Sequence, residues 1–310
     1  MIDPQALQAL VAVERTGSVA AAAASLGFTP SAVSQQVKKL ERQAGAALLE
    51  RQGRGVLLTE RGRVLALRGS ELLAQLEELE SELAADDLPS GVLRLASFSS
   101  ANRAFLGKLA MALRRHAPAL ELQAAAAEPE EAARKVAAGE VDVAIIHNWN
   151  SVRLEVNPSV ETRSLCRDVA DVLLPRDHPL AARSEVTVRD VQNEPWCATP
   201  PGAICHEALL RLFAIQGAAP RIVFTDPEFG THVGIVADGA ALALVPRLGR
   251  PRLPPEVVAR PLIPGRSSAE VSPEDLPARH ILVAYRKTVA ANPGVRLAVR
   301  ELKTIAAALG

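Results

Sequence analysis

The stretch that decides the fold of the first part of the chain is TPSAVSQQVKKLE, Thr29–Glu41. At about 100° per residue, Val33, Val37 and Leu40 form the narrow apolar stripe of a helix that lies on a small core. The opposite side carries hydroxyl, amide and cationic groups, from Ser31, Gln35, Lys38 and Arg42. A solvated helix face usually mixes acids with bases, whereas this face carries donors suited to phosphates and base edges. The stretch by itself is compatible with both interpretations.

The neighbouring residues favour nucleic-acid binding. Thr29 is a good N-cap, and Gly45 can adopt the left-handed conformation that ends a helix, so we expect a helix from about Pro30 to Ala44. Two helices are expected before it, one from Asp3-Pro4 to Gly17 and an alanine-rich one from Ser18 to Gly27. The second ends only a few residues before Thr29, which is the spacing of a helix-turn-helix.

A cationic hairpin is expected next. LLERQGRGVLLT, residues 48–59, has two short apolar runs around a glycine-rich turn, with Arg54 at the tip. Such a hairpin beside a recognition helix is a wing. We expect Ser31, Ser34, Gln35 and Lys38 to face the major groove, and Arg51 and Arg54 to hold phosphate or the minor groove. Arg42, on the same outer face of the helix, is a further DNA-binding candidate. Lys39 points about 100° away from that face.

The distribution of charge agrees with a DNA-binding head. The 310 residues have a net charge of zero, with 48% hydrophobic and 23% charged residues, as in ordinary globular proteins. Residues 1–58 nevertheless carry +2, and residues 59–87 carry −5. So modest a positive charge favours a dimer, in which two heads add their phosphate contacts.

A long helix is predicted from Thr59 to about Leu83. Leu65, Leu72 and Leu79 recur every seven residues, and Leu76 and Leu83 complete an a/d seam with Gly69 as its weak point. The helix could pack on its own domain, but its acidic flanks favour a rod paired with another chain. DDLPSG, residues 86–91, marks a domain boundary.

From Ala22 to Gly62 the sequence resembles the N-terminal domain of LysR-type transcriptional regulators. The matching landmarks are Ala22, Ala23, Ser31, Ser34, Leu40, Glu41, Gly45, Arg51, Leu58, Thr59 and Gly62. Leu49 stands where the family commonly has Phe, which should alter only packing. The resemblance implies a homodimer or homotetramer that binds double-stranded DNA, bends it and engages RNA polymerase.

The remaining residues alternate between strands and helices. Strands are expected in VLRLASF (92–98), ALELQAA (119–125) and VDVAII (141–146), the last of them buried, and a second set, from DVLLP (171–175) onward, begins near Cys166. Alternation implies open parallel sheets with helices on both faces. The pattern resembles the periplasmic-binding-protein-like effector domain of the same family, although Ala241 stands where glycine is usual. Residues 267–279 are expected to form an exposed loop.

The expected architecture is therefore an α-rich winged helix-turn-helix, a linker helix and a C-terminal α/β effector domain of two periplasmic-binding-protein-like subdomains. We place the DNA-binding domain at residues 1–58, the linker at 59–87 and the effector domain at 88–310. Its first subdomain takes 88–165 and 268–310, and its second takes 166–267.

A small-molecule effector is expected in the cleft at the carboxyl ends of the strands. The candidate residues follow those strands: Ser97, Ser99, Ser100, Asn148, Thr199, Gly202, Ala203, His206, Phe229 and Thr231. Two groups begin helices, whose free N–H groups favour an anion, so we expect a small carboxylate. Ser99 and Thr199 are equally explained as simple N-caps.

Other functions fit the sequence less well. Cys197 and Cys205 flank a loop in the subdomain where peroxide-sensing members of the family use a cysteine pair, so a redox sensor of the same fold is an alternative. A solute-binding protein would need export, and no signal segment or membrane span is evident, so we expect a cytoplasmic protein without membrane partners. Because no nucleophile elbow, phosphate loop or metal motif occurs, we expect no enzyme activity, cofactor or metal.

Overall fold

The computed structural model describes residues 1–52, 55–85, 87–263 and 276–309. The chain divides into two compact units, Met1–Asp87 with Lys287–Asn292, and Leu88–Arg286 with Pro293–Gly310. Each unit is described by itself below.

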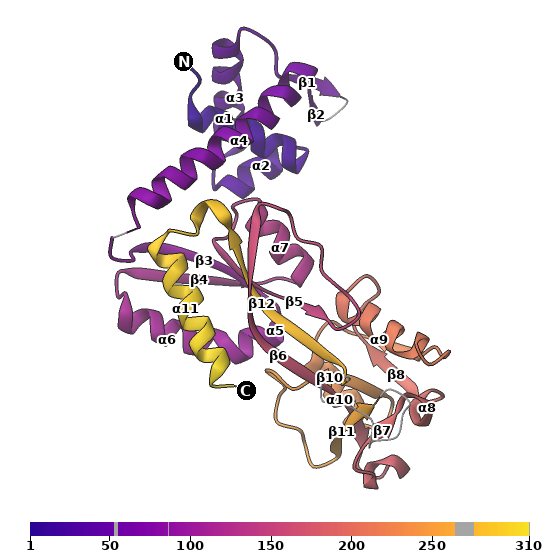
Figure 1. Ribbon diagram of the computed structural model, residues 1–310. Helices are drawn as coiled ribbons and strands as arrows, with labels where there is room; N and C mark the ends of the chain where they lie inside the picture. Colours follow the sequence, from indigo (N-terminus) through magenta and orange to yellow (C-terminus); the bar gives the residue numbers. More distant parts are fainter. Residues whose placement is uncertain (53–54, 86, 264–275, 310) are drawn as a thin grey trace. The chain divides into compact units, whose positions relative to one another are not determined.

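Three short helices build the core of the N-terminal unit (Figure 1). They are α1 (Pro4–Thr16), α2 (Val19–Leu26) and α3 (Pro30–Ala44), which agree with the predicted helix-turn-helix. Asp3, Ser18 and Thr29 cap their N-termini through side-chain oxygens. Each helix ends at a glycine with positive φ, a conformation that lets the chain turn sharply at little cost.

The hairpin and the long helix follow. β1 (Leu49–Gln52) pairs antiparallel with β2 (Gly55–Leu58), as predicted for the wing. The long helix α4 (Glu60–Leu83) begins after its N-cap, Thr59.

The leucine seam predicted for α4 does not pack in the same way along the whole helix. Gly62, Ala66 and Gly69 are buried, and a Cβ at Gly69 would come within 2.5 Å of the Leu7 side chain on α1. Gly69 is therefore a site of close helix packing rather than the weak point of the helix. The leucines of the second half of α4 are exposed: Leu72, Leu76, Leu79 and Leu83.

The second unit is built on one ten-stranded mixed sheet. The strand order is β4-β3-β5-β12-β6-β10-β8-β9, with β11 on β6 and β7 on β11. The strands are β3 (Gly91–Ser97), β4 (Leu120–Ala126), β5 (Val143–Trp149), β6 (Val160–Pro175), β7 (Val186–Thr187), β8 (Pro195–Ala198), β9 (Arg221–Thr225), β10 (Leu242–Pro246), β11 (Val257–Ile263) and β12 (Ala278–Arg286). The helices are α5 (Ser99–Ala101), which continues through the π-helical turn η1 (Asn102–Leu106) into α6 (Gly107–His116), then α7 (Pro129–Ala137), α8 (Val188–Val191), α9 (Ile204–Ala214), α10 (Phe229–Ala237) and α11 (Pro293–Ala307); two 3-10 turns, η2 (Pro179–Ala182) and η5 (Lys287–Val289), complete the elements.

Two long strands join the two halves of this sheet (Figure 1). β6 pairs with β12 through residues 160–169, and with β10 and β11 through residues 170–175. The sequence predicted a strand only from Asp171, because VETRSLCRDVA lacks an apolar run and several of its side chains are exposed. The second expected crossing, near residue 265, lies outside the described residues.

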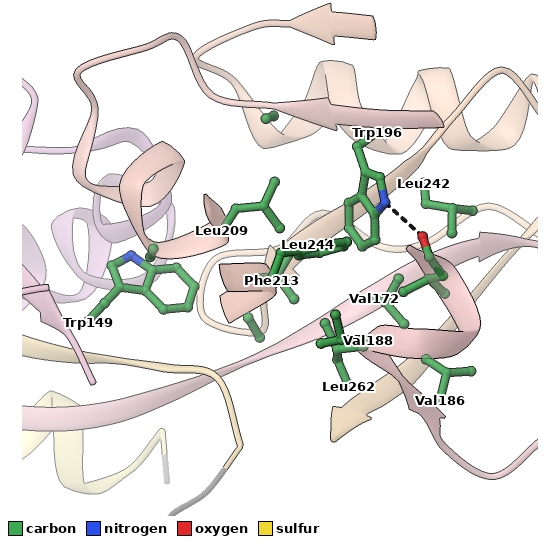
Figure 2. Close-up of a cluster of buried hydrophobic side chains, with 14 of the residues drawn as sticks. Trp149, Val172, Val186, Val188, Trp196, Leu209, Phe213, Leu242, Leu244 and Leu262 are labelled. Carbon is green, nitrogen blue, oxygen red and sulfur yellow. Dashed lines mark hydrogen bonds between the residues drawn. The ribbon is translucent and has the colours of Figure 1, made fainter. Parts of the chain in front are cut away.

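The half of the sheet around β8 and β10 has a core of large apolar side chains (Figure 2). Trp196 lies edge-on to Phe213, with ring centroids 5.3 Å apart, and its Nε1–H donates to Val191 O at 3.2 Å. Burying both rings fixes β8 and α9 relative to each other. The segment between these elements carries the candidates Thr199, Gly202 and Ala203, and α9 carries His206.

Candidate functional site

The outer face of α3 carries the predicted recognition residues. Ser31, Gln35, Lys38 and Arg42 are exposed, and Ser34 is half-buried. Val33, Val37 and Leu40 are buried beneath them, as the apolar stripe predicted. Gln35, Lys38 and Arg42 line one side of a broad surface hollow that continues to residues 45–47. This face therefore presents an amide and two cations side by side.

Two other side chains on α3, those of Lys39 and Glu41, make contacts within the N-terminal unit. Lys39 Nζ lies 2.5 Å from Asp3 Oδ2, and this hydrogen bond lowers the pKa of Asp3. Glu41 Oε1 accepts from the backbone N–H groups of Leu48 and Leu49 at 2.8 and 3.3 Å. Lys39 and Glu41 thus tie α3 to the chain start and to the wing.

The wing is only partly described. Arg51 lies in β1 opposite Val56, while Arg54 lies outside the described residues. Thr59 Oγ1 donates to Ala47 O at 2.9 Å and accepts from Gly62 N–H at 3.0 Å. These bonds connect the start of α4 with the segment that leads into the wing.

A buried ion pair lies at the centre of the second unit. Arg279 on β12 faces Asp168 on β6, with Nη2 2.6 Å from Oδ2 and both side chains 1% exposed. Arg279 was expected in an exposed loop, and this prediction was wrong, because PEDLPAR is polar whereas tertiary pairing draws its last two residues into β12. The sequence offered no signal for its partner, because Asp168 lies in the part of β6 that was not predicted as a strand.

Arg279 gathers the first group of candidate residues. Its Nη2 donates to Ser100 Oγ at 3.0 Å. Its guanidinium carbon lies 5.0 Å from the ring centroid of Phe98 and 5.9 Å from that of Phe229, within the range of cation–π attraction. Residues after β3 and after β9 therefore converge on one cation.

Contacts across the cleft join α5 and η1 to Glu228, the residue before α10. Ser99 Oγ donates to Glu228 Oε1, and Arg103 Nη1 lies 3.5 Å from Glu228 Oε2. Ser99 is not an N-cap, since Phe98 precedes the helix and provides no side-chain cap. Glu128, at the start of α7, has a raised pKa because of burial and of the nearby Glu130 and Glu228. The cleft thus combines a buried cation with acidic groups.

Three candidates do not join this arrangement. Ser97 is fully buried and donates to Asn102 Oδ1, and Asn148 Oδ1 accepts from Leu154 N–H at 2.8 Å. Both side chains stabilise local turns. Thr231 is exposed on α10.

The start of α9 holds the second group. The N-cap is Ala203, which has no capping side chain, so the explanation of Thr199 as an N-cap is wrong. His206 Nδ1–H donates to Thr199 O at 2.6 Å, while Thr199 Oγ1 is buried without a hydrogen-bond partner. Gly202 occupies the exposed turn before Ala203, with φ of +89°.

His147, at the end of β5, borders this group. Its ring is 1% exposed, Nδ1 has no hydrogen-bond partner, and Nε2 lies 3.9 Å from Cys205 Sγ. Burial, and then the charge of Arg279, lower the pKa of His147 well below its usual value of 6.5. A neutral imidazole therefore faces the thiol. Trp149 Nε1–H points at the same sulfur, at 3.4 Å.

The thiols are not activated by these surroundings. Burial raises the pKa of Cys205, and it raises the pKa of Cys197 to about 11. Reactive cysteines need the opposite shift. All three cysteines are free thiols in this structure.

The described part of the chain holds no cluster of metal-ligating side chains and no single helix that could span a membrane. No group of three or more His, Cys, Asp or Glu side chains is arranged to hold a metal ion there. No single helix there has the length and apolarity to cross a membrane. The bent pair of α1 and α2 has that length and apolarity only when the two helices are taken together.

Comparison with known families agrees with this architecture. Residues 4–63 match the bacterial regulatory helix-turn-helix protein of the lysR family, and residues 86–307 match the LysR substrate binding domain. The chain belongs to the LysR family of transcriptional regulators. It is a DNA-binding regulator with an effector-binding domain.

Relatives of this regulator align over most of their length. It is 30% identical to the small neutral protease regulatory protein of Streptomyces coelicolor, over 78% of this chain and 73% of that protein. It is 29% identical to the HTH-type transcriptional regulator YvbU of Bacillus subtilis, over 83% of this chain and 87% of the relative. A full-length OxyR variant from Pseudomonas aeruginosa shares the fold, with a TM-score of 0.71, 19% identity and 98% of each chain covered.

Proposed function

We propose that this LysR-type regulator acts by binding alone, without catalysis, and reads a dyad-symmetric DNA site as a dimer or tetramer. Ser31, Ser34, Gln35 and Lys38 would contact the major groove, and Arg42, Arg51 and Arg54 would contact phosphate or the minor groove. The exposed face of α3, cationic over a buried apolar stripe, carries this proposal. The DNA-binding domain is then residues 1–58.

The linker, residues 59–87, would join two chains. Its support is the run of exposed leucines on the second half of α4. Leu72, Leu76 and Leu79 line a hollow of about 400 Å³ against Ile2 and Leu7 of the α1 segment. Covering this apolar surface with a second copy of the helix would remove it from water, which favours association.

The effector would bind in the cleft of residues 88–310, between a subdomain of 88–165 with 268–310 and one of 166–267. A small carboxylate fits the uncapped N-terminus of α9, the unpartnered Thr199 Oγ1 and the unpartnered His147 Nδ1. Glu128 and Glu228 line the same region and would repel a negatively charged ligand. An effector with one negative charge is therefore favoured over an effector with two. Ser99, Ser100, Ala203, His206 and Phe229 would complete the site.

Effector binding would then change how the DNA-binding heads are placed. Arg279 contacts residues from both halves of the sheet, so a ligand beside it would bias how the two subdomains close. In an oligomer that closure would shift the spacing of the heads on DNA and thereby the contact with RNA polymerase.

The test of DNA recognition is a footprint on the DNA upstream of the regulator's own gene. Gln35→Ala should mainly lose discrimination between specific and random DNA, because amides read base edges. Arg51→Ala should weaken binding to both and flatten the dependence on salt. Equal losses of specific and random affinity in Gln35→Ala would reject the assignment of Gln35 to the groove.

The effector is tested by calorimetry with a panel of matched carboxylates and amides. Thr199→Val keeps the volume of the side chain but removes the hydroxyl, so it should weaken the carboxylate that binds. Binding of neutral or cationic compounds alone would reject a carboxylate effector.

A further inference from the structure

We propose that the regulator has a second ligand site beside β6, which takes a monocarboxylate with an apolar body and modulates the cleft. The site is a pocket of about 320 Å³ against β6 and the loop after β10. Its walls are formed by Ala104, Cys166, Arg167, Asp168, Val169, Arg247, Leu248, Gly249 and Leu309. The candidate residues of the cleft do not line it, so it is a separate place on the molecule.

A buried carboxylate fixes the cationic wall. Asp171, whose side chain is 5% exposed, accepts from Arg247 Nε and Nη2 at 2.9 and 2.6 Å. Arg250 Nη1 donates to the same carboxylate at 3.0 Å. Two guanidinium groups share one carboxylate, so this group of three side chains carries one net positive charge.

Arg247 is positioned to receive an anion. Its bonds to Asp171 use Nε and Nη2, and Nη1 makes no other hydrogen bond or ion pair within the described ranges. About half of the side chain is exposed, so the outer edge of the guanidinium is accessible. A fixed guanidinium edge binds a carboxylate in a defined orientation. One carboxylate would neutralise the net charge of Arg247, Arg250 and Asp171, and Arg167 adds a further cation to the pocket wall.

The opposite wall is apolar. Ala104 on η1, Leu248 and Leu309 supply aliphatic surface, and Leu309 is 38% exposed where α11 has ended. A ligand that places its carboxylate on Arg247 would cover this surface with its body. Pockets of this size suit small molecules rather than peptides.

The loop at residues 247–249 connects this pocket with the cleft. Leu248 N–H donates to Asp168 Oδ1 at 2.8 Å, and Asp168 Oδ2 holds Arg279 in the cleft. Gly249 lies so close to Ser100 that a Cβ there would come within 1.9 Å of Ser100 O. Arg103 Nε also donates to Gly249 O at 2.6 Å. An occupant that contacts this loop therefore acts on Asp168 and Ser100, both of which accept hydrogen bonds from Arg279.

The binding test uses cyclohexanecarboxylate and, as a matched neutral probe, cyclohexanecarboxamide. Dissociation constants are measured by ligand-observed NMR on the full-length protein. We expect the carboxylate to bind at least tenfold more tightly than the amide. Arg247→Gln should lose at least tenfold, whereas Arg189→Gln, which removes an exposed arginine elsewhere in the same unit, should bind as the wild type does.

A second variant separates charge from shape. Leu309→Gln keeps every charge and changes an exposed residue that lies beyond the end of α11, so it should fold normally and weaken the binding of the carboxylate severalfold. Thr199→Val, in the cleft, should leave this affinity unchanged, which distinguishes the pocket from the proposed effector site. Equal binding of carboxylate and amide, or full affinity in Arg247→Gln, would overturn the proposal.

Coupling to the cleft is measured by the fluorescence of Trp149, which contacts Cys205 there. Saturating cyclohexanecarboxylate should change the emission of the wild type and of Arg189→Gln. The change should disappear in Trp149→Phe and in Arg247→Gln. Binding to the pocket without a change in emission would reject the modulatory role.

Discussion

Arg279 and Asp168 are cross-strand partners whose ion pair, with Nη2 2.6 Å from Oδ2, is buried where β6 and β12 join the two halves of the sheet. A buried pair of this kind gains little net stability when intact, but it is costly to break, since one charge is then left without a partner. The ion pair therefore disfavours any change in the pairing of β6 with β12, because such a change would separate the two charges.

Asp168→Ala should lower the free energy of unfolding of the second unit by about 3–5 kcal/mol. Urea unfolding followed by tryptophan fluorescence measures this, because both tryptophans, Trp149 and Trp196, lie in this unit. The double variant with Arg279→Met should lose less than the single variant does. Glu131→Ala, which removes a partly exposed ion pair with Lys135, is the control and should cost less than about 1 kcal/mol.

Gly62→Ala should destabilise the N-terminal unit by roughly 1–3 kcal/mol or more and weaken DNA binding. A Cβ at this position would lie 2.2 Å from Leu48 O, so the segment that enters the wing must move. Calorimetric unfolding and anisotropy with labelled DNA measure the two effects. Gly107→Ala is the matched control: its Cβ would meet nothing within 4 Å, so it should be neutral or stabilise the helix by about 0.5–1 kcal/mol.

Lys38 and Lys39 are adjacent but should behave differently on DNA. Lys38 is exposed on the outer face of α3, whereas Lys39 is paired with Asp3. Lys38→Ala should reduce the slope of log affinity against log salt by about 0.9 for each phosphate that the lysine neutralises. Lys39→Ala should leave the slope unchanged, and the same reduction of slope in both variants would contradict the assignment of the face.

His147 should make the stability of the second unit depend on pH. Because burial lowers its pKa in the folded state, the unfolded chain binds more protons below about pH 6.5. The contribution of the neutral His147 to the free energy of unfolding is complete above pH 6.5. It is lost as the pH falls toward the pKa of the folded state, by up to about 1.4 kcal/mol per pH unit. His147→Gln should remove this part of the pH dependence, which corresponds to one proton taken up on unfolding. His232, whose pKa burial also lowers, should retain its own part of the dependence.

The cysteines should react slowly in the folded protein. With pKa values of about 11 for Cys166 and Cys197, few thiolates exist at neutral pH. We expect iodoacetamide to modify the native protein far more slowly than the urea-unfolded chain. Rapid formation of a Cys197–Cys205 disulfide with peroxide, seen by mass spectrometry, would revive the alternative of a redox sensor.

Local sequence patterns were enough to predict the individual helices and most strands. Caps such as Thr29 and Gly45, the stripe of Val33, Val37 and Leu40, and the alternation of apolar runs depend on neighbours a few residues away, so they could be read directly. Helix starts and buried strands therefore fell close to their predicted positions. The outer face of α3 followed from the same periodicity.

Contacts between residues far apart in the sequence could not be predicted in this way. Arg279 lies in a polar segment that predicts a loop, and its burial follows from pairing with Asp168, 111 positions away. Gly69 suggested a weak point in a helix until the approach of Leu7 was seen. The pocket at Arg247 likewise depends on Asp171 and on the end of α11. Long-range pairing and packing set these contacts, and a local pattern does not encode them.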